Sequence, residues 1–484
     1  MDVRVRIAPS PTGYLHLGTA RSALFNYLFA KKNNGTFILR IEDTDKERSK
    51  PEFEQSIMNG LRWLGILWDE GPDCGGLYGP YRQSERADFY AKAFSTLEQK
   101  GMVYECYCTT QELEEEKRIQ MLSKQPPRYN SKCRDLSDNT REQLRKEKGS
   151  WVYRFRTPAQ IVEWNDLIHG VVSFDTKLFG DMVIAKQDKG VLYNFAVVVD
   201  DELMRISHVI RGEDHISNTP KQILMAQALD YHLPIYGHIP LILNPDRSKM
   251  SKRKQEVDID AFRRHGYLPE AMLNYISFLG WNPGDDRELF TLEELCQFFS
   301  IDRVQKSGAI FSTQKLDWFN QEYIRNKSTE ELLSLCQPYL PKEHSLRSDQ
   351  LLAIITIVKD RLRVCSDSTV LADFFFTAPV FSDPTILIWK KMKTDDPKTR
   401  THALLDQLRT YLETIEHDAW QTDVLEARIK QWITDNQIGA GEILWPMRVA
   451  LSGKEQSPGP FEIAHVLGSV ESLKRISYAL QQLS

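Results

Sequence analysis

Arg6-Ile7-Ala8-Pro9-Ser10-Pro11-Thr12-Gly13-Tyr14-Leu15-His16-Leu17-Gly18-Thr19-Ala20-Arg21 is a short segment near the N-terminus that joins a predicted strand to a predicted helix. The alternation over residues 3–7 predicts the strand, and apolar residues at helical spacing follow the segment. A glycine-containing loop at a helix N-terminus can approach an anion closely. His16 then supplies a donor near a bound phosphate. The segment predicts an anion site, with an ordinary surface loop as the alternative.

Length and composition indicate a large protein of several domains whose cysteines are reduced. The 484 residues exceed what one core accommodates and predict three or four domains. No apolar run has the length of a membrane span, and the N-terminus lacks the apolar stretch of a signal peptide. Seven cysteines predict free thiols. We therefore expect a cytoplasmic protein without membrane contact. The net charge of −5 argues weakly against nucleic acid, although binding depends on where basic residues cluster.

The first hundred residues alternate strand and helix patterns, as a doubly wound α/β domain requires. A second strand over residues 36–41 is followed by Glu42, Asp43, Thr44 and Asp45. Ligands of such sheets bind beyond the carboxyl ends of the strands, where these carboxylates lie. Glu42 is predicted to hold a substrate ammonium group, whereas the two aspartates fit a helix cap equally well.

Residues 102–179 interrupt this alternation. Cys106, Cys108, Cys133 and Asp135 predict a closed zinc site, because zinc accepts thiolates and carboxylates in tetrahedral geometry. Three buried free thiols beside a surface aspartate are the alternative. Basic residues surround these cysteines and suit contact with a phosphate backbone, although such charges are also often merely solvated. They are Lys117, Arg118, Lys124, Arg128, Lys132 and Arg134.

Three further strands are predicted over residues 197–201, 206–210 and 239–243. Their ends bring polar groups to the same sheet edge as the opening segment. The last runs into a lysine-rich loop, Asn244 to Lys254, whose ammonium groups can approach a polyphosphate. A basic nucleic-acid patch or a solvated loop are the alternatives for that loop alone.

The chain is predicted to be helical from about residue 257. Pro269 begins an apolar-periodic helix with Gly280 as its stop. Thr291 with Glu294, and Ser328 with Glu331, fit capping boxes. Four more amphipathic helices are expected, around residues 351–364, 427–434, 443–451 and 463–480. This part carries no catalytic cluster, which is typical of a recognition or assembly module.

Five motifs in order resemble the class I aminoacyl-tRNA synthetases, specifically the bacterial-type glutamyl-tRNA synthetases. The resemblance covers essentially the whole chain. The motifs are Pro9-Ser10-Pro11-Thr12-Gly13 with His16-Leu17-Gly18-Thr19, Arg40-Ile41-Glu42-Asp43-Thr44-Asp45, Tyr193-Asn194-Phe195, His208-Val209-Ile210-Arg211-Gly212-Glu213-Asp214-His215, and Lys249-Met250-Ser251-Lys252-Arg253.

The resemblance implies an α/β fold in which a Rossmann-type catalytic domain of doubly wound parallel sheet holds an inserted acceptor-binding domain. All-α stem-contact and anticodon-binding domains follow. The expected bounds are residues 1–101 and 191–256 for the two catalytic halves, 102–190 for the insertion, 257–327 for the stem-contact domain and 328–484 for the anticodon-binding domain.

The resemblance also implies a two-step reaction. Glutamate attacks the α-phosphate of ATP, and a terminal ribose hydroxyl of tRNA(Glu) then takes the glutamyl group. His16, Lys249 and Lys252 are the implied catalytic residues, with Mg²⁺ neutralising phosphate charge. The implied ATP-binding residues are Pro9, Gly13, His16, Gly18, Thr19, Met250, Ser251 and Lys252.

Glutamate has two carboxylates and one ammonium group, so its site requires two cationic groups and one anionic group. Arg6 and Arg211 can each pair with a carboxylate, and which arginine takes which one stays open. Ser10 and Glu42 are expected at the ammonium, and Tyr193 at the side-chain end. Ion pairs with neighbouring acidic residues are the alternative for either arginine.

The resemblance further implies a monomer that binds tRNA(Glu), glutamate and ATP, with zinc in a purely structural role. Three other functions stay open: a synthetase that also charges tRNA(Gln), a glutaminyl enzyme and a catalytically silent tRNA-binding module. A short paralog that glutamylates a tRNA base is disfavoured, because it would lack the helical C-terminal domains.

Overall fold

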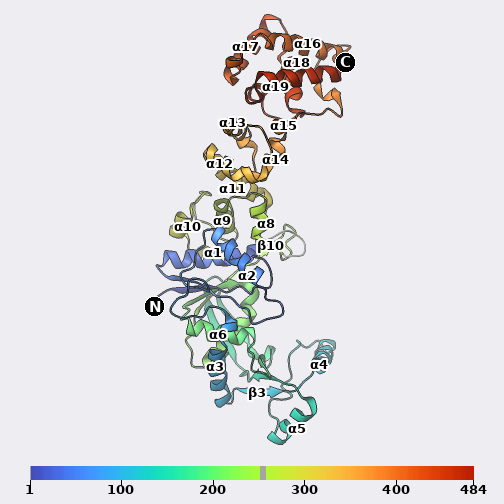
Figure 1. The fold of residues 1–484 in the computed structure, drawn as a ribbon. Helices are drawn as coiled ribbons and strands as arrows, with labels where there is room; N and C mark the ends of the chain where they lie inside the picture. The colour runs from blue at the N-terminus through green and yellow to red at the C-terminus, as the bar shows by residue number, and fades with distance from the viewer. Residues whose placement is uncertain (1, 251–257) are drawn as a thin grey trace. The chain divides into compact units, whose positions relative to one another are not determined.

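The computed structural model describes residues 2–250 and 258–484 (Figure 1). The chain forms two compact units. The first comprises Met1–Arg264 and Pro269–Leu316, and the second comprises His265–Leu268 and Asp317–Ser484. No helix among the described residues combines the length and apolar character needed to cross a membrane.

Parallel strands form the centre of the first unit. Strand β1 (Arg4–Ile7) pairs in parallel with β2 (Thr36–Leu39), and β8 (His208–Gly212) pairs in parallel with β9 (Ile235–Ile239). The backbone N–H of Ser207 donates to the carbonyl of Arg4 at 2.9 Å, which places β8 beside β1. The carboxyl ends of β1, β2 and β8 therefore lie along one edge.

Helices cover both faces of these strands. Helix α1 contacts β1, β2 and β8, while a shared core joins side chains of β2 and β8 to those of α3 and α6. Figure 1 draws α1 above the strands and α6 below them. This arrangement confirms the predicted doubly wound α/β class. The helices are α1 (Leu17–Lys32), α2 (Pro51–Trp63), α3 (Ala87–Gln99), α6 (Tyr193–Leu203) and α7 (Thr219–Ala228).

The strand predicted over residues 197–201 was wrong, because this segment lies inside α6. Its three valines favour a strand by propensity, but every residue from 195 to 201 is buried in the helix. Burial on all sides removes the polar spacing that distinguishes a helix in the sequence. The strand predicted over residues 206–210 is confirmed as β8, shifted by two residues. The segment 239–243 is split between the end of β9 and the short strand β10 (Ile242–Leu243).

Antiparallel structure replaces the parallel pattern between β3 and β7. Strands β3 (Val103–Cys106), β4 (Val152–Phe155) and β7 (Val183–Lys186) form a three-stranded sheet. Strands β5 (Ile161–Asp166) and β6 (Gly170–Asp175) form a separate hairpin. Helices α4 (Thr110–Leu122) and α5 (Asp138–Lys148) bury no residue. The predicted break in the α/β alternation is confirmed.

The elements from residue 259 to residue 326 complete the first unit and lead into the second. Both predicted capping residues, Thr291 in the first unit and Ser328 in the second, form complete capping boxes with the glutamate three positions later. Gly280 lies two residues past the end of α9, with φ of 99°. The elements are α8 (Ile259–Arg264), α9 (Pro269–Phe278), α10 (Leu292–Phe298) and β11 (Ala309–Ile310), which pairs with β10. Helix α11 (Thr313–Asn326) follows.

The second unit is all-helical, as predicted, and none of its residues lies in a strand. Its longest helix, α19 (Pro460–Leu483), packs against α16 and α18. Helix α19 changes direction at Gly468, where φ is 75°. The other helices are α12 (Thr329–Cys336), α13 (Ser348–Val358), α14 (Ser368–Leu371), α15 (Asp373–Phe376), α16 (Pro397–Leu412), α17 (Thr422–Asp435) and α18 (Ala440–Ser452).

Candidate active site

A cavity of about 1310 Å³ lies beyond the carboxyl ends of β1, β2 and β8. This is the position at which open α/β sheets bind their ligands. All predicted ATP-binding and glutamate-binding residues that the structure describes line it, together with the predicted catalytic residue Lys249. They are Arg6, Pro9, Ser10, Gly13, His16, Gly18, Thr19, Glu42, Tyr193, Arg211, Lys249 and Met250. Ser251 and Lys252 lie outside the described residues.

The opening segment presents the N-terminus of α1 to this cavity. His16 is the N-cap residue, and its Nδ1 accepts a hydrogen bond from the Gly18 N–H at 3.0 Å. With Nδ1 as acceptor, a neutral His16 ring carries its proton on Nε2. The first turn of α1 contains no acidic residue, so no side chain of that turn offsets the positive dipole end of the helix. The loop therefore has the chemistry of an anion site.

Arg6 lies in a buried network of alternating charges. Its Nε and Nη2 donate to the two carboxylate oxygens of Asp201 at 3.1 and 3.2 Å. Arg40 donates to Asp201 at 2.7 Å and to Glu42 at 3.1 Å. Burial raises the pKa of Glu42, against the opposing effect of Arg40 and Arg6. The ion pair considered for Arg6 from the sequence is present.

Arg211 differs from Arg6 because no carboxylate among the described residues pairs with it. Its Nε donates to His238 Nε2 at 3.3 Å, and its Nη2 donates to Thr219 Oγ1 at 2.8 Å. The third nitrogen, Nη1, is buried and has no hydrogen-bond partner in the described part of the chain. A buried donor without a partner is costly unless a ligand satisfies it. Because Arg211 lines the cavity, an anion bound there could accept a hydrogen bond from Nη1.

Tyr193, the first residue of α6, extends this wall of the cavity. Its hydroxyl lies 3.2 Å from His215 Nδ1. Burial raises the pKa of Tyr193. Burial, together with the nearby Arg211 charge, lowers the pKa of His215 to about 4. Both groups are therefore neutral hydrogen-bonding partners near pH 7.

The beginning of the lysine loop lies at the same cavity. Lys249 Nζ forms an ion pair with Asp214 Oδ2 at 3.2 Å. Met250 is buried, and its N–H donates to the carbonyl of Ile242 at 3.2 Å. The sequence motif thus reaches the site from the end of β10, next to the residues that follow β8.

Four residues of the site were not singled out from the sequence. The sequence pattern places Asp201 at the end of a predicted strand, and the resemblance implies no role for His215. Thr219 and His238 contact Arg211 but carry no local signal. The sequence signal that points to His215 is its place at the end of the charged motif that begins at His208.

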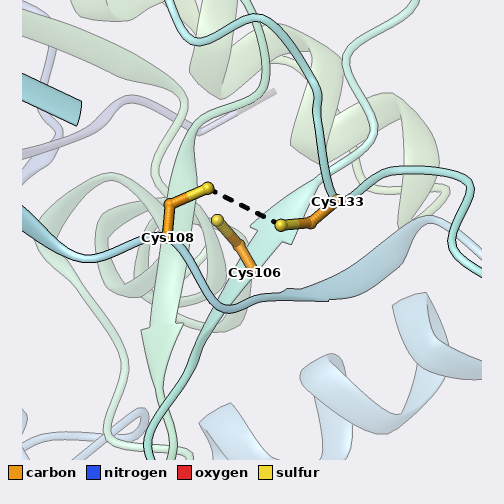
Figure 2. A group of neighbouring side chains, drawn as sticks. All are labelled: Cys106, Cys108 and Cys133. Carbon is orange, nitrogen blue, oxygen red and sulfur yellow. Dashed lines mark hydrogen bonds between the residues drawn. The ribbon is translucent and has the colours of Figure 1, made fainter. Parts of the chain in front are cut away.

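The predicted zinc residues are separated by the structure. The Sγ atoms of Cys106, Cys108 and Cys133 all lie within 4.8 Å of one another, and they point toward one another in Figure 2. Asp135 is not with them, because its exposed carboxylate pairs with Arg156 at 2.9 Å. The Tyr129 hydroxyl lies beside the thiols instead, 3.4 Å from Cys106 Sγ and 3.9 Å from Cys108 Sγ. Hydrogen bonds from Cys108 and Cys133 lower the pKa of Cys106.

Comparison with known proteins identifies the class that this fold and site define. Residues 2–318 match the family of class I tRNA synthetases (E and Q), catalytic domain. Residues 331–480 match the anticodon binding domain family. The chain therefore belongs to the class I tRNA synthetases for glutamate and glutamine.

Within that class, the similar proteins are glutamate–tRNA ligases. That of Carboxydothermus hydrogenoformans is 42% identical, over 98% of this chain and 99% of its own. That of Bacillus subtilis is 39% identical over the same shares. A crystal structure of the glutamate tRNA ligase of Elizabethkingia meningosepticum in complex with its amino acid has a TM-score of 0.89, at 33% identity and full coverage of both chains. This chain belongs to the bacterial-type glutamate–tRNA ligase family.

Proposed function

We propose that the chain joins glutamate to tRNA(Glu) in two ATP-dependent steps. Glutamate attacks the α-phosphate of ATP, pyrophosphate leaves, and a hydroxyl of the terminal ribose displaces AMP from the glutamyl-adenylate. The observation that carries the proposal is the buried Arg211 guanidinium, which has neither a carboxylate partner nor a partner for Nη1 among the described residues. An amino acid carboxylate is complementary to this guanidinium in charge and can accept a hydrogen bond from Nη1.

Glutamate binding is assigned to five side chains of the cavity wall. Arg6 and Arg211 bring two guanidinium groups, and the buried Glu42 brings a carboxylate for the ammonium group. Ser10 and Tyr193 add hydroxyl groups to the same wall. Asp201 already neutralises Arg6, so Arg211 supplies the less compensated positive charge.

ATP binding is assigned to the opposite side of the opening segment. The N-terminus of α1 and the Nε2 of His16 offer donors to phosphate oxygens. Pro9, Gly13, Gly18, Thr19, Met250 and Ser251 complete the proposed nucleotide site. Lys249 and Lys252 would stabilise the charge that develops on the departing pyrophosphate. Mg²⁺ is expected to share this role, because it bridges phosphate oxygens in such reactions.

Recognition of tRNA(Glu) is assigned to segments outside the cavity. We keep residues 102–190 as the acceptor-binding insertion, 257–327 as the stem-contact domain and 328–484 as the anticodon-binding domain. Residues 1–101 and 191–256 remain the proposed catalytic halves. All seven cysteines are free thiols, which supports a reducing cytoplasmic location. Operation as a monomer stays a prediction.

Zinc binding is proposed for the three clustered cysteines, with the Tyr129 hydroxyl in place of Asp135. The fit rests on three thiols gathered at one point with an oxygen donor beside them. Zn²⁺ bound by thiolates would hold β3 and the segment around Cys133 together, which is a structural contribution. No step of the reaction requires it.

The test is aminoacylation of purified tRNA(Glu) and tRNA(Gln) with glutamate and with glutamine. The proposal predicts glutamyl-tRNA(Glu) and no glutaminyl-tRNA. Charging with glutamine in preference to glutamate would contradict the substrate assignment. Glutamyl-tRNA(Gln) in addition would identify the non-discriminating alternative, and no charging of either tRNA would identify a silent tRNA-binding module.

A further inference from the structure

The guanidinium of Arg211 is held by a chain of hydrogen bonds that begins in the β5–β6 hairpin. Asp166, the last residue of β5, is buried, and its Oδ2 lies 2.5 Å from His238 Nδ1. His238, on β9, is buried as well and accepts from Arg211 Nε at 3.3 Å through its other ring nitrogen. Thr219 Oγ1 closes the arrangement, 3.0 Å from His238 Nε2 and 2.8 Å from Arg211 Nη2.

The protonation states of Asp166 and His238 determine which atom donates and which accepts in each of these hydrogen bonds. Burial would raise the pKa of Asp166, but the hydrogen bonds from His238 and from the His169 backbone hold it at about 2. Burial, with the Arg211 charge, lowers the pKa of His238. A neutral ring beside an ionised carboxylate donates from Nδ1 and accepts at Nε2. Asp166 therefore fixes the tautomer that can accept from Arg211.

The hairpin is itself fixed to β9 by backbone contacts. The Leu167 N–H donates to the carbonyl of Tyr236 at 2.8 Å. Asp166 Oδ1 accepts from the backbone N–H groups of Ile168, His169 and His238 at 3.0 to 3.2 Å. The Asp166 carboxylate is therefore held in one position. Through its hydrogen bond to His238 it also fixes the imidazole that accepts from Arg211.

We propose that Asp166, His238 and Thr219 are positioning residues for glutamate, which hold Arg211 so that its free Nη1 faces the substrate carboxylate. This inference rests on the proposed role of Arg211 in amino acid binding. The neutral imidazole matters chemically, because it orients the guanidinium without neutralising it. Asp201, by contrast, orients Arg6 with a full opposite charge. The β5–β6 hairpin thereby contributes to the affinity for the amino acid, although it carries none of the residues assigned to glutamate or ATP.

The principal test is the isosteric variant Asp166→Asn. The amide oxygen can keep the three backbone hydrogen bonds, but the amide NH₂ then faces His238 Nδ1. The His238 ring must then accept at Nδ1 and carry its proton on Nε2. An Nε2–H cannot accept the hydrogen bond from Arg211 Nε, so this contact is lost. We expect the KM for glutamate to rise about tenfold or more, because a hydrogen bond to a charged group is lost. The KM for ATP should stay within about twofold.

Two further comparisons separate positioning from a general loss of structure. Thr219→Val should raise the KM for glutamate, whereas Thr219→Ser keeps the hydroxyl and should restore it. Thr176→Val is the matched control, because Thr176 is buried directly after the end of β6. Among the described residues, its hydroxyl forms hydrogen bonds with the backbone of Pro158 and Gln160 and with no other group. Its KM for glutamate should match that of the wild type.

The outcomes also distinguish this inference from the proposed function. Absence of glutamate charging by the wild type would refute the function and the inference with it. Normal charging by the wild type, with an unchanged glutamate KM in folded Asp166→Asn, would refute the inference alone. Parallel increases in the KM for glutamate and for ATP would also refute it, as would equal effects of Thr219→Val and Thr219→Ser. If Asp166→Asn does not fold, the Thr219 pair decides.

Discussion

Replacing Arg211 by methionine should strongly reduce glutamate activation without destabilising the protein. The buried guanidinium forms no ion pair with a carboxylate of the described residues, and its Nη1 has no hydrogen-bond partner among them. Methionine keeps an unbranched side chain of similar length and removes the charge. The hydrogen-bond partners that Arg211 leaves behind, His238 Nε2 and Thr219 Oγ1, lie 3.0 Å apart and can satisfy each other. The variant therefore leaves no new orphaned group.

The expected magnitudes follow from this geometry. Loss of one partner of a buried charge pair costs about 2 to 5 kcal/mol in binding, which is roughly a 30- to 5,000-fold decrease in kcat/KM for glutamate. The free energy of unfolding should change by less than about 1 kcal/mol, since two net hydrogen bonds are lost while the desolvation cost of a buried charge disappears.

Arg6→Met is the matched comparison. It breaks the two-bond ion pair with Asp201, although Arg40 stays 2.7 Å from the same carboxylate. Breaking a buried pair costs about 3 to 5 kcal/mol, and the remaining arginine should keep the loss near the lower limit. Arg6→Met should therefore lose both activity and stability.

The assay combines aminoacylation kinetics with urea unfolding of the two variants and the wild type. The KM for ATP serves as an internal control, because neither arginine is assigned to the nucleotide. If Arg211→Met charges tRNA with glutamate at nearly the wild-type kcat/KM, the carboxylate assignment is wrong. If it unfolds as readily as Arg6→Met, the description of Arg211 as an uncompensated charge is wrong.

Four other predictions test separate parts of the account. Lys252→Ala should slow adenylate formation by roughly two to four orders of magnitude with little change in tRNA binding, and near-normal activation would remove this residue from catalysis. Metal analysis of protein never exposed to metal-affinity resin should find zinc in the wild type and in Asp135→Ala but not in Cys133→Ser. Loss of zinc from Asp135→Ala would show that Asp135, and not Tyr129, is the fourth ligand. The affinity for tRNA should fall steeply with salt despite the net charge of −5, and a flat response would contradict contacts with the phosphate backbone. Folding lowers the pKa of His215 from 6.5 to about 4, so the neutral ring contributes to the free energy of unfolding above pH 6.5, and this contribution is lost as the pH falls through 4. In urea unfolding, the free energy of unfolding of His215→Asn should therefore decrease less than that of the wild type as the pH is lowered. Identical dependences on pH would refute the shift.

Local chemistry explains what the sequence predicted well. The opening loop and both capping boxes depend on residues close together in the chain, so their patterns can be recognised directly in the sequence. The polar ends of β1, β2 and β8 were also predictable, because parallel strands bring their carboxyl ends to one edge. The residues expected around ATP and glutamate consequently line one cavity where the structure describes them.

Long-range pairing explains what the sequence did not predict. Arg6 and Asp201 are 195 positions apart, and Asp166 and His238 are 72 apart. No local pattern indicates that such residues meet. Burial on every side also hid the helical spacing of α6, so its valines were assigned to a strand. Asp135 was chosen for zinc by its spacing from Cys133, whereas the chain folds Tyr129 back onto the thiols.

The most direct test of the central claim is a crystal structure of the protein with bound glutamate. We predict a glutamate carboxylate within hydrogen-bond distance of Arg211 Nη1, with Nε and Nη2 still bound to His238 and Thr219. A glutamate whose two carboxylates both lie elsewhere, with Nη1 still unpartnered, would contradict it.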